Sequence, residues 1–366
     1  MKIRIERERL SKPLAMVNGI VEKRQTLPIL GNVYIKSENG SLWLVGTDLE
    51  TEVATRIEDV ECSAGECTVA ARKLFDICRS LPEDATLDIE GKADKVSIKA
   101  GTSRFTLQGL PPGDFPRIEA DQWEHEFEIE PGVLKQLLER TAFAMAQQDV
   151  RYYLNGLLLE LSDRRLRAVA TDGHRLARSE VALEESPGRA QQAIVPRKAV
   201  LEMTRFLDDA DGPARVALST NHMRLGTDSW LFITKLIDGR FPDYEKVVPK
   251  GLSIGLRVKR RDFHDILNRA AILTNEKFRG VRLSLSKDRM TVTAHNPEQE
   301  EAIDQMAVEY DGGELEIGFN VGYLMEALRA LENDEVEVGL QDANSSCTLE
   351  GPEGGETLYL VMPMRL

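Results

Sequence analysis

The segment ATDGHRLA, residues 170–177 of the 366-residue chain, contains the residue types of an acid–base site. It places Asp172, His174 and Arg175 within four residues, directly after an apolar run. An aspartate close to a histidine can act as a catalytic acid–base pair. An aspartate at such a place can instead accept hydrogen bonds from turn amides, which is a common use of Asp in loops. The sequence favours the turn, with His174 packed at a domain edge.

Other catalytic and metal-binding patterns are missing from the sequence. There is no G-x-S-x-G elbow, Walker A loop or Rossmann glycine run. The five histidines and four cysteines show no ligand spacing, so we expect no metal and no cofactor. The amino-terminal residues MKIRIERERL lack an apolar stretch typical of a signal peptide, and no run approaches the roughly 20 apolar residues of a membrane span. These features indicate a cytoplasmic protein with reduced thiols.

A repeat of 124 residues dominates the sequence. The segments LWLVGTDLETEV, LRAVATDGHRLA and MTVTAHNPEQEE share one pattern of alternating strand, polar pair and charged stretch, and Gly46, Ala170 and Ala294 are 124 apart. A second strand precedes each segment, so each pair predicts a hairpin. Only the middle copy carries the histidine. The turn itself recurs in all three copies, so we expect it to be structural.

Two amphipathic helices recur with the same period. One series follows a short alternating strand, with apolar residues at helical spacing near residues 10–21, 134–145 and 263–270. The other lies in the segments 69–81, 194–207 and 318–331, each of which runs from a strand into a helix. The sequence therefore predicts an α+β fold of three tandem domains, at residues 1–120, 127–245 and 247–366. A repeat of this length can enclose its own core.

Charge is unevenly distributed along the chain. The formal net charge of −14 argues against a nucleic-acid partner, but residues 1–120 contribute −2 (17 basic, 19 acidic) and residues 248–366 contribute −8 (13 basic, 21 acidic). Basic residues gather on and beside the recurring helices, including Arg72, Lys73, Arg197 and Lys198. If these helices share one face, that face can contact phosphates without reading base sequence, although ordinary solvated helix charges give the same pattern.

Several phrases together resemble the bacterial β sliding clamp family, the processivity factors of DNA polymerase III. They are TLPILGN, QDVRYYLNG, ATDGHRLA, DGRFPDY, NPEQEEA and the terminal VMPMRL, and with the three-fold repeat they cover the whole chain. The resemblance implies domains of two helices backed by two antiparallel sheets. It also implies a head-to-tail homodimeric ring with pseudo-six-fold symmetry, whose helices line a hole around duplex DNA and whose sheets continue across domain boundaries. Such a protein is a non-catalytic subunit.

Three sets of residues carry over from the family by position. The resemblance implies DNA contacts at Arg24, Arg72, Gln148, Tyr152, Tyr153, Arg197 and Lys198. It implies a pocket for a short Gln/Leu/Phe-type peptide, with its polar rim at His174, Arg175 and Lys246, made by Leu154, Thr171, Gly173, His174, Arg175, Leu176, Pro242, Lys246, Val247, Asn320, Tyr323, Ser346, Val361, Met362, Pro363, Met364 and Arg365. Lys246, where some members have arginine, and Asn344, where an apolar residue can occur, depart from the family pattern.

The partners implied are the polymerase III catalytic subunit, the δ subunit of the clamp loader, other polymerases and mismatch-repair proteins. Subunit contacts are expected between the first domain of one copy and the last domain of the other. Two features suggest this: the last domain is more acidic than the first, and apolar residues stand at a candidate edge strand and at a helix end. The residues are Phe105, Leu107, Ile272, Leu273, Glu298, Glu300 and Glu301. The alternative is a cytoplasmic three-domain enzyme or regulator that uses Asp172 and His174.

Overall fold

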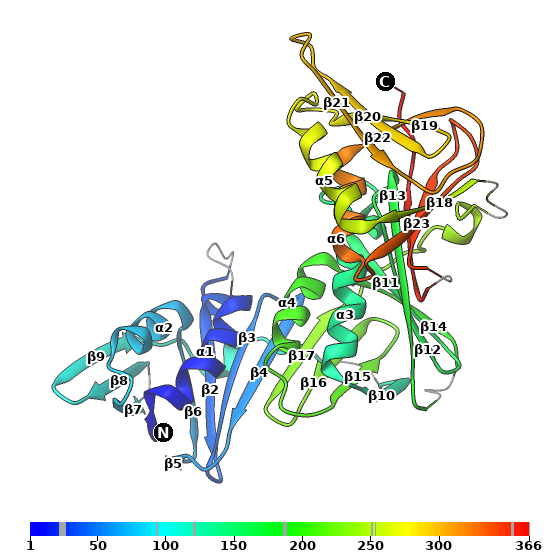
Figure 1. The fold of residues 1–366 in the computed structure, drawn as a ribbon. Coiled ribbons are helices and arrows are strands. Elements are labelled where there is room, and N and C mark those ends of the chain that lie inside the picture. The colour runs from blue at the N-terminus through cyan, green and yellow to red at the C-terminus, as the bar shows by residue number, and fades with distance from the viewer. Residues whose placement is uncertain are drawn as a thin grey trace. The chain divides into compact units, whose positions relative to one another are not determined.

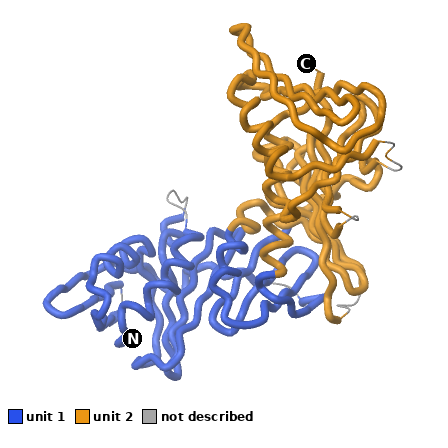
Figure 2. Tube along the Cα trace, viewed as in Figure 1, with its two compact units in different colours: residues 1–132, 202–236 blue, residues 133–201, 237–366 orange. Residues whose placement is uncertain are grey.

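The structure, a computed structural model, describes residues 1–21, 27–92, 94–119, 122–185, 189–249, 252, 254–352 and 355–365. Two compact units are distinguished in Figure 2: residues 1–132 with 202–236, and residues 133–201 with 237–366. This division cuts the middle of the three predicted domains, because that domain shares one β-sheet with the first domain and another with the third. The exact domain boundaries therefore stay a prediction.

The order of elements repeats three times, as the sequence predicts (Figure 1). Each repeat consists of a strand, a helix, several strands, a second helix and further strands. The helices of the described residues are α1 (Arg7–Ile20), α2 (Ala71–Ser80), α3 (Pro131–Ala142), α4 (Arg197–Leu207), α5 (Arg260–Ala271) and α6 (Val321–Ala330). None of these helices is both long and apolar enough to cross a membrane.

The first unit contains a five-stranded and an eight-stranded antiparallel sheet. The five-stranded sheet has the order β5 (Glu61–Ser63), β1 (Lys2–Glu6), β7 (Thr86–Lys92), β8 (Lys95–Ala100) and β9 (Ser103–Gln108). The eight-stranded sheet has the order β10 (His125–Ile129), β15 (Ala214–Leu218), β16 (His222–Gly226), β17 (Trp230–Lys235), β4 (Thr51–Ile57), β3 (Ser41–Thr47), β2 (Asn32–Glu38) and β6 (Gly65–Ala70). The pairing of β17 with β4 joins the middle and first repeats.

The second unit contains an eight-stranded and a four-stranded antiparallel sheet. The eight-stranded sheet has the order β14 (Gln191–Pro196), β11 (Gly156–Ser162), β12 (Arg165–Thr171), β13 (Arg175–Ala182), β25 (Thr357–Val361), β24 (Cys347–Glu350), β23 (Glu335–Leu340) and β18 (Ile254–Lys259). The four-stranded sheet has the order β21 (Glu301–Ala307), β20 (Arg289–His295), β19 (Gly280–Ser286) and β22 (Leu315–Asn320). Here β13 pairs with β25, so sheets continue across both repeat junctions.

Apolar spacing determines how the helices pack on these sheets. In α1, Leu10, Leu14, Val17 and Ile20 are buried, and the helix packs against β3 and β4. Residues three and four apart lie on one face of a helix, so this spacing produces a single apolar stripe. The same stripe recurs in α5, where Phe263, Ile266, Leu267 and Ala270 are buried. In α1 and α5 most charged side chains lie on the opposite, exposed face.

The chain leaving β9 is fastened to the first repeat. Phe115 is buried against Val45 and Ala54, and its ring lies 5.5 Å from that of Tyr34. Two residues later, Arg117 forms an ion pair with Glu52 on β4, whose side chain is 2% exposed. A carboxylate at such depth needs partners, because an unpaired buried charge is costly. The connection between the first two repeats is thus fixed by packing and by charge.

Candidate functional site

Asp172 holds the turn between β12 and β13 through backbone hydrogen bonds. Its Oδ1 accepts from the backbone N–H of His174 at 2.9 Å and of Arg175 at 3.0 Å. Gly173 has φ +89°, a left-handed conformation that glycine adopts without strain. Thr171 closes the turn, because its Oγ1 accepts from Gly173 and donates to the carbonyl of Arg175. The predicted structural role of Asp172 is confirmed.

The equivalent turns use the same device. Asp48 Oδ1 accepts from the N–H of Glu50 at 3.0 Å and of Thr51 at 2.7 Å. In the last repeat, Asn296 Oδ1 accepts from the N–H of Glu300 at 2.9 Å. A side-chain oxygen that satisfies turn amides is a frequent reason for Asp and Asn in loops. The three repeats therefore share the turn, and the middle copy adds Gly173, His174 and Arg175 to it.

Arg175 lies at the centre of a network that sequence reasoning missed. Its guanidinium donates to Asp172 Oδ2 at 3.1 Å, to the carbonyl of Phe143 at 2.8 Å and to the carboxylate of Glu326. Its Cζ also lies 4.5 Å from the ring centroid of Tyr323. Burial and the nearby Asp172 raise the pKa of Tyr323. The arginine is largely buried, so it orders the site instead of reaching out from the rim as expected.

The carboxyl-terminal tail contacts the same turn. Val361, the last residue of β25, stands opposite Arg175 in the sheet, and the backbone N–H of Met362 donates to the carbonyl of His174 at 2.9 Å. Two residues later, the N–H of Met364 donates to the carbonyl of Gly318 at 2.9 Å. The tail therefore connects the turn of the middle repeat with strand β22 of the last repeat.

Most predicted peptide-site residues lie around this turn. Leu154 and Leu176 belong to one buried apolar cluster, with Phe241, Tyr244 and Leu360. The ring of His174 is stacked over that of Tyr323, with 6.5 Å between centroids. The remaining residues differ in exposure: Pro242, Val247, Met362 and Arg365 are exposed, whereas Asn320, Ser346, Pro363 and Met364 are partly buried.

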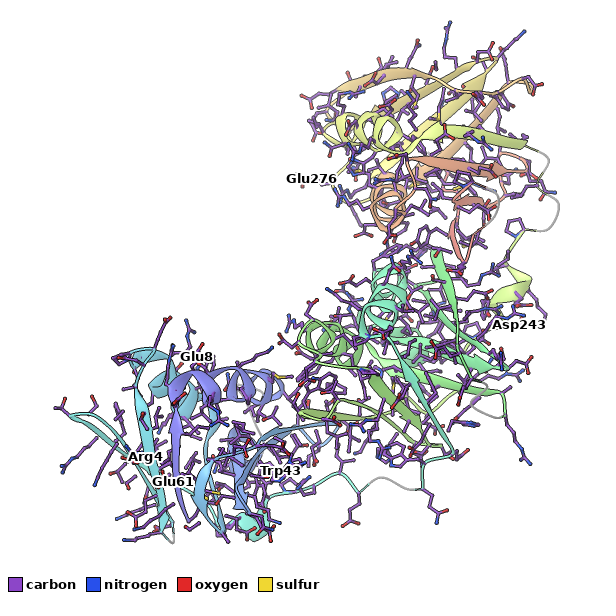
Figure 3. All side chains as sticks on the ribbon, turned by 60° about the horizontal axis from the view of Figure 1, so that its bottom comes forward. Arg4, Glu8, Trp43, Glu61, Asp243 and Glu276 are labelled. Carbon is purple, nitrogen blue, oxygen red and sulfur yellow. The ribbon has the colours of Figure 1, made fainter. Side chains whose placement is uncertain are left out.

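The predicted rim cation Lys246 is paired within its own segment. It belongs to the short 3-10 helix η4 (Tyr244–Lys246), and its Nζ lies 3.0 Å from Asp243 Oδ2; Asp243 is labelled in Figure 3. The lysine side chain is 80% exposed, so this ion pair is weak and can exchange. Asn320 has a different use, since its Oδ1 caps helix α6 by accepting from Gly322 and Tyr323.

A loop that contains three predicted DNA contacts touches the turn directly. Asp149 binds the guanidinium of Arg151 through both carboxylate oxygens, at 3.0 and 2.9 Å, which holds the pKa of Asp149 at about 2. Arg151 also donates to the carbonyl of Asp172 at 3.3 Å. Nearby, Gln148 is exposed with φ +55°, and Tyr152 is exposed with its ring 5.8 Å from that of Tyr153.

The other predicted DNA contacts divide into exposed and half-buried side chains. Arg72 on α2 and Lys198 on α4 are exposed. Arg197 is partly buried and donates to the carbonyls of Ala142 and Met145 at 3.4 and 3.3 Å. Burial and the nearby Arg175 lower the pKa of Arg197. Arg24 lies outside the described residues.

The predicted subunit contacts fall on or beside two edge strands and just after helix α5. Phe105 and Leu107 are partly buried on β9, the last strand of the five-stranded sheet. Ile272 directly follows α5 and is 76% exposed, and Leu273 beside it is partly buried. All three predicted acidic contacts, which are Glu298, Glu300 and Glu301, are exposed at the start of β21 or just before it.

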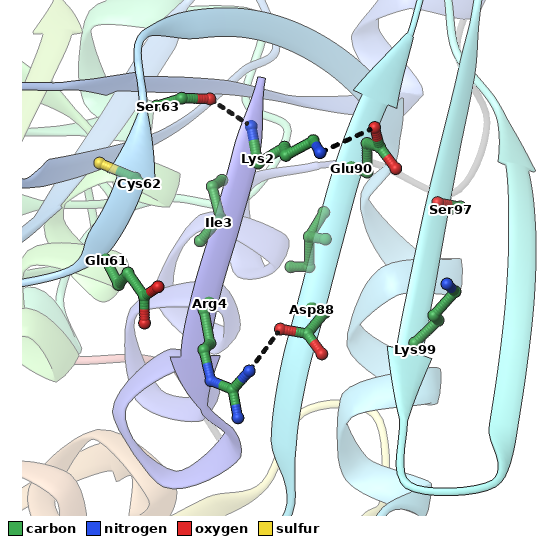
Figure 4. A pocket seen from close by; sticks show the side chains of 11 residues that line it. Lys2, Ile3, Arg4, Glu61, Cys62, Ser63, Asp88, Glu90, Ser97 and Lys99 are labelled. Atoms are coloured by element: carbon green, nitrogen blue, oxygen red, sulfur yellow. Dashed lines mark hydrogen bonds and ion pairs between the residues drawn. The ribbon is translucent and has the colours of Figure 1, made fainter.

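A separate cleft of about 500 Å³ lies on the five-stranded sheet (Figure 4). Four of its charged side chains are paired across neighbouring strands: Lys2 with Glu90 at 3.7 Å and Arg4 with Asp88 at 3.5 Å. Paired, exposed charges are typical of the solvent face of an antiparallel sheet. In the described part of the chain, no group of three or more His, Cys, Asp or Glu side chains is arranged to hold a metal ion.

Comparison with known proteins gives one consistent result over the full length. Family models of the DNA polymerase III beta subunit match residues 1–119 (N-terminal domain), 128–243 (central domain) and 245–365 (C-terminal domain). The chain is 48% identical to a beta sliding clamp from Pseudomonas putida and 46% identical to one from Escherichia coli, with 100% of each chain covered.

Solved structures agree with these matches. The DNA polymerase III subunit beta from Pseudomonas aeruginosa superposes with a TM-score of 0.97 at 48% identity, with both chains fully covered. A sliding clamp from Bartonella birtlesii bound to griselimycin gives 0.95 at 38% identity, again over both full chains. The fold of three α+β repeats, the shared sheets and this similarity lead to one conclusion: the chain belongs to the beta sliding clamp family of DNA polymerase III beta subunits.

Proposed function

We propose that this chain is a DNA sliding clamp. Two copies close into a ring around duplex DNA and tether the replicative polymerase, so that the polymerase stays on its template. The observation that carries this proposal is the similarity to beta sliding clamps over the whole chain, with all three domains matched in order. A match to one domain alone would also be compatible with a protein of different function that shares this domain.

Retention on DNA by such a ring comes from topology. Exposed Lys and Arg side chains contact phosphates weakly and in a salt-dependent way. Arg72, Lys198, Gln148, Tyr152 and Tyr153 are the proposed contacts, together with Arg24 and Arg197. Weak contacts suit a ring that must move along DNA, because tight and specific ones would hold it in place.

Ring closure is proposed to join β9 of one copy to the region of α5 and β21 in the other. Both strands are the last of their sheets, and an unpaired strand edge readily accepts a second chain. Phe105 and Leu107 supply apolar side chains on one edge, and Ile272 and Leu273 on the other. The acidic groups of Glu298, Glu300 and Glu301 would face two basic side chains of the other copy, Lys99 on β8 and Arg104 on β9.

The partner site is proposed to lie at the turn of Asp172 and the carboxyl-terminal tail. Leu154 and Leu176 contribute its apolar base, Met362 an adaptable wall, and His174 and Tyr323 an aromatic surface. A short Gln/Leu/Phe-type peptide of the polymerase catalytic subunit, of the δ subunit of the clamp loader, or of other polymerases and mismatch-repair proteins is the proposed ligand. The protein acts in the cytoplasm.

The chain is proposed to be non-catalytic. An enzyme at Asp172 and His174 needs the carboxylate to orient the imidazole. The oxygens of Asp172 instead accept hydrogen bonds from two turn amides and from the guanidinium of Arg175. The imidazole is stacked on Tyr323. This geometry supports a binding surface.

Retention on closed circular DNA tests the proposal. The clamp is loaded with its clamp loader onto a nicked circle and separated from free protein by gel filtration. We expect it to stay with the circle and to be released when a restriction enzyme linearises the DNA. Release from circular and linear DNA at the same rate would contradict encirclement. A hydrolytic or transfer activity that is lost in His174→Ala would support the alternative, an enzyme that uses Asp172 and His174.

A further inference from the structure

A second cleft, of about 420 Å³, adjoins the carboxyl-terminal tail on the last repeat. We call it the flanking cleft. Its lining residues come from the loop after α5, from β19 and β20, from the turn after β20 and from the tail, and they are Asn275, Phe278, Gly280, Arg282, Thr293, His295, Asn296, Pro297, Met364 and Arg365. Among these residues, Met364 and Arg365 also belong to the proposed partner site, and Asn296 holds the turn after β20.

The loop that presents Phe278 is rigidly built. Asn275 Oδ1 accepts from the backbone N–H of Lys277 at 2.9 Å and of Phe278 at 3.1 Å, and the carbonyl of Asn275 accepts from Arg279 at 2.8 Å. Asn320, which caps α6, donates to the carbonyl of Phe278 at 3.3 Å. Figure 3 labels Glu276, which lies in this loop. The backbone thus fixes the position of an aromatic residue that stays largely exposed.

Phe278 presents an exposed aromatic ring, and the Nζ of Lys277 lies 5.2 Å from its centroid. The residue is 56% exposed, in a domain where Phe263 and Phe319 are fully buried. An exposed aromatic ring on a hydrogen-bonded turn, lining the same cleft as Met364, is the kind of surface that anchors a partner side chain. The volume of the cleft admits such a side chain.

The flanking cleft is lined by basic side chains, although its domain carries a net negative charge. Residues 248–366 contain 21 acidic and 13 basic side chains, yet the ten lining residues include Arg282, Arg365 and His295 and no carboxylate. Arg282 lies 3.6 Å from Glu316, and His295 lies 3.4 Å from Glu301, in exposed pairs that a ligand can replace. The lining therefore favours an apolar side chain accompanied by carboxylates.

The tail connects this cleft with the partner site. Met362 is hydrogen-bonded to His174, and Met364 and Arg365, two and three residues further on, line the flanking cleft. An extended chain covers at most about 3.5 Å per residue, so a few residues beyond the motif are enough to pass from one surface to the other. A single partner segment can occupy both.

We propose that the flanking cleft binds the residues next to the linear motif in the same partner chain. One apolar side chain packs against Phe278 and Met364, while neighbouring carboxylates face Arg282 and Arg365. The inference rests on the proposed function, because the motif must bind at the turn of Asp172. It adds a second recognition element, which lets partners with equal motifs differ in affinity through their flanking residues.

Fluorescence anisotropy with labelled synthetic peptides tests this inference on the full chain. The probes are a short Gln/Leu/Phe motif peptide and two longer ones, extended by six residues on its amino or its carboxyl side with one Phe and three Asp. We expect one extended peptide to bind at least ten times more tightly than the short one. Phe278→Ala and Arg282→Gln should each remove most of this gain and leave the affinity for the short peptide unchanged.

Arg289→Gln is the matched control, since Arg289 is an exposed arginine on the same face of the same sheet. It lies six residues before His295 on β20, roughly 20 Å along the strand. We expect it to leave all affinities unchanged. A version of the tighter peptide with Asn in place of Asp should lose part of the gain.

The outcomes separate the two proposals. If the short peptide does not bind, the proposed partner site fails and the inference fails with it. If the short peptide binds and neither extension increases affinity, only the inference is overturned. Equal losses for short and extended peptides in Phe278→Ala would also overturn it, because Phe278 would then belong to the motif site. Sedimentation of each variant checks that the dimer is intact.

Discussion

Arg117 and Glu52 form a two-pronged ion pair: Nε lies 3.0 Å from Oε2, and Nη2 lies 2.8 Å from Oε1. The backbone N–H of Ile118 donates to the same carboxylate at 3.0 Å. Glu52 is thus satisfied by the connection between the first two repeats, 65 residues away in the sequence. The pair ties that connection to β4 within the first unit.

Removing the arginine should destabilise this unit. Arg117→Ala leaves a buried carboxylate with one backbone donor, and we expect the free energy of unfolding to fall by about 2–4 kcal/mol, measured by urea denaturation. Arg4→Ala is the control, because its pair with Asp88 is exposed and worth less than about 1 kcal/mol. Equal effects of the two variants would contradict the structural importance of the buried pair.

The turn at Gly173 should not tolerate a side chain. A Cβ there would lie 3.0 Å from the guanidinium of Arg151, and φ +89° is strained for alanine. We expect Gly173→Ala to cost about 1–2 kcal/mol of stability and to weaken binding of the short motif peptide. Gly113→Ala, where a Cβ meets nothing within 4 Å, should change neither quantity. Unchanged peptide affinity in Gly173→Ala would show that the turn is remote from the partner site.

The basic residues on the helices should divide into two classes. Arg72→Ala with Lys198→Ala should reduce retention on circular DNA at moderate salt and leave the melting temperature unchanged, because both side chains are exposed. Arg197→Ala should lower both, since its guanidinium also binds the carbonyls of Ala142 and Met145. Retention that does not depend on salt would rule out phosphate contacts as the explanation.

Subunit association should depend on the apolar residues after α5. Ile272→Ala combined with Leu273→Ala removes side chains that the proposed interface buries, and we expect monomers in analytical ultracentrifugation. Val133→Ala, a smaller truncation of an exposed residue on α3, should leave the dimer intact. A dimer that survives the double substitution would place the interface elsewhere.

Thiol reactivity should single out one cysteine. Burial raises the pKa of Cys67 and of Cys347 from 9.0 to about 12 and raises that of Cys78, whereas Cys62 is partly exposed. A disulfide reagent at pH 8 should therefore modify one thiol in the native protein and four after denaturation. The folded state keeps these thiols protonated at pH values where the unfolded chain ionises them. Burial of the thiols therefore leaves the free energy of unfolding unaffected below about pH 9 and lowers it as the pH rises toward 12. Rapid modification of several native thiols would contradict this burial.

The sequence predicts the order of elements well, because a repeat of 124 residues shows the same hydrophobic pattern three times. It also predicts Asp172 as a turn residue, since Asp48 and Asn296 stand at equivalent places. The burial of Arg175 could not be predicted, because its partner Glu326 is 151 residues away. The burial of Glu52 and the partial burial of Arg197 could not be predicted either, because only tertiary contacts reveal them.

The two strand pairs that join the repeats also determine how the chain carries load. β17 and β4 are aligned over five residue pairs, from Trp230 opposite Thr55 to Thr234 opposite Thr51, and β13 and β25 over another five. Tension that acts across these ladders must break several hydrogen bonds together, whereas the outer edges of β9 and β21 have no strand of this chain beside them in the described sheets. Under mechanical strain we therefore expect the repeat junctions to hold and the ring to part first at the proposed contacts between a second chain and these free edges.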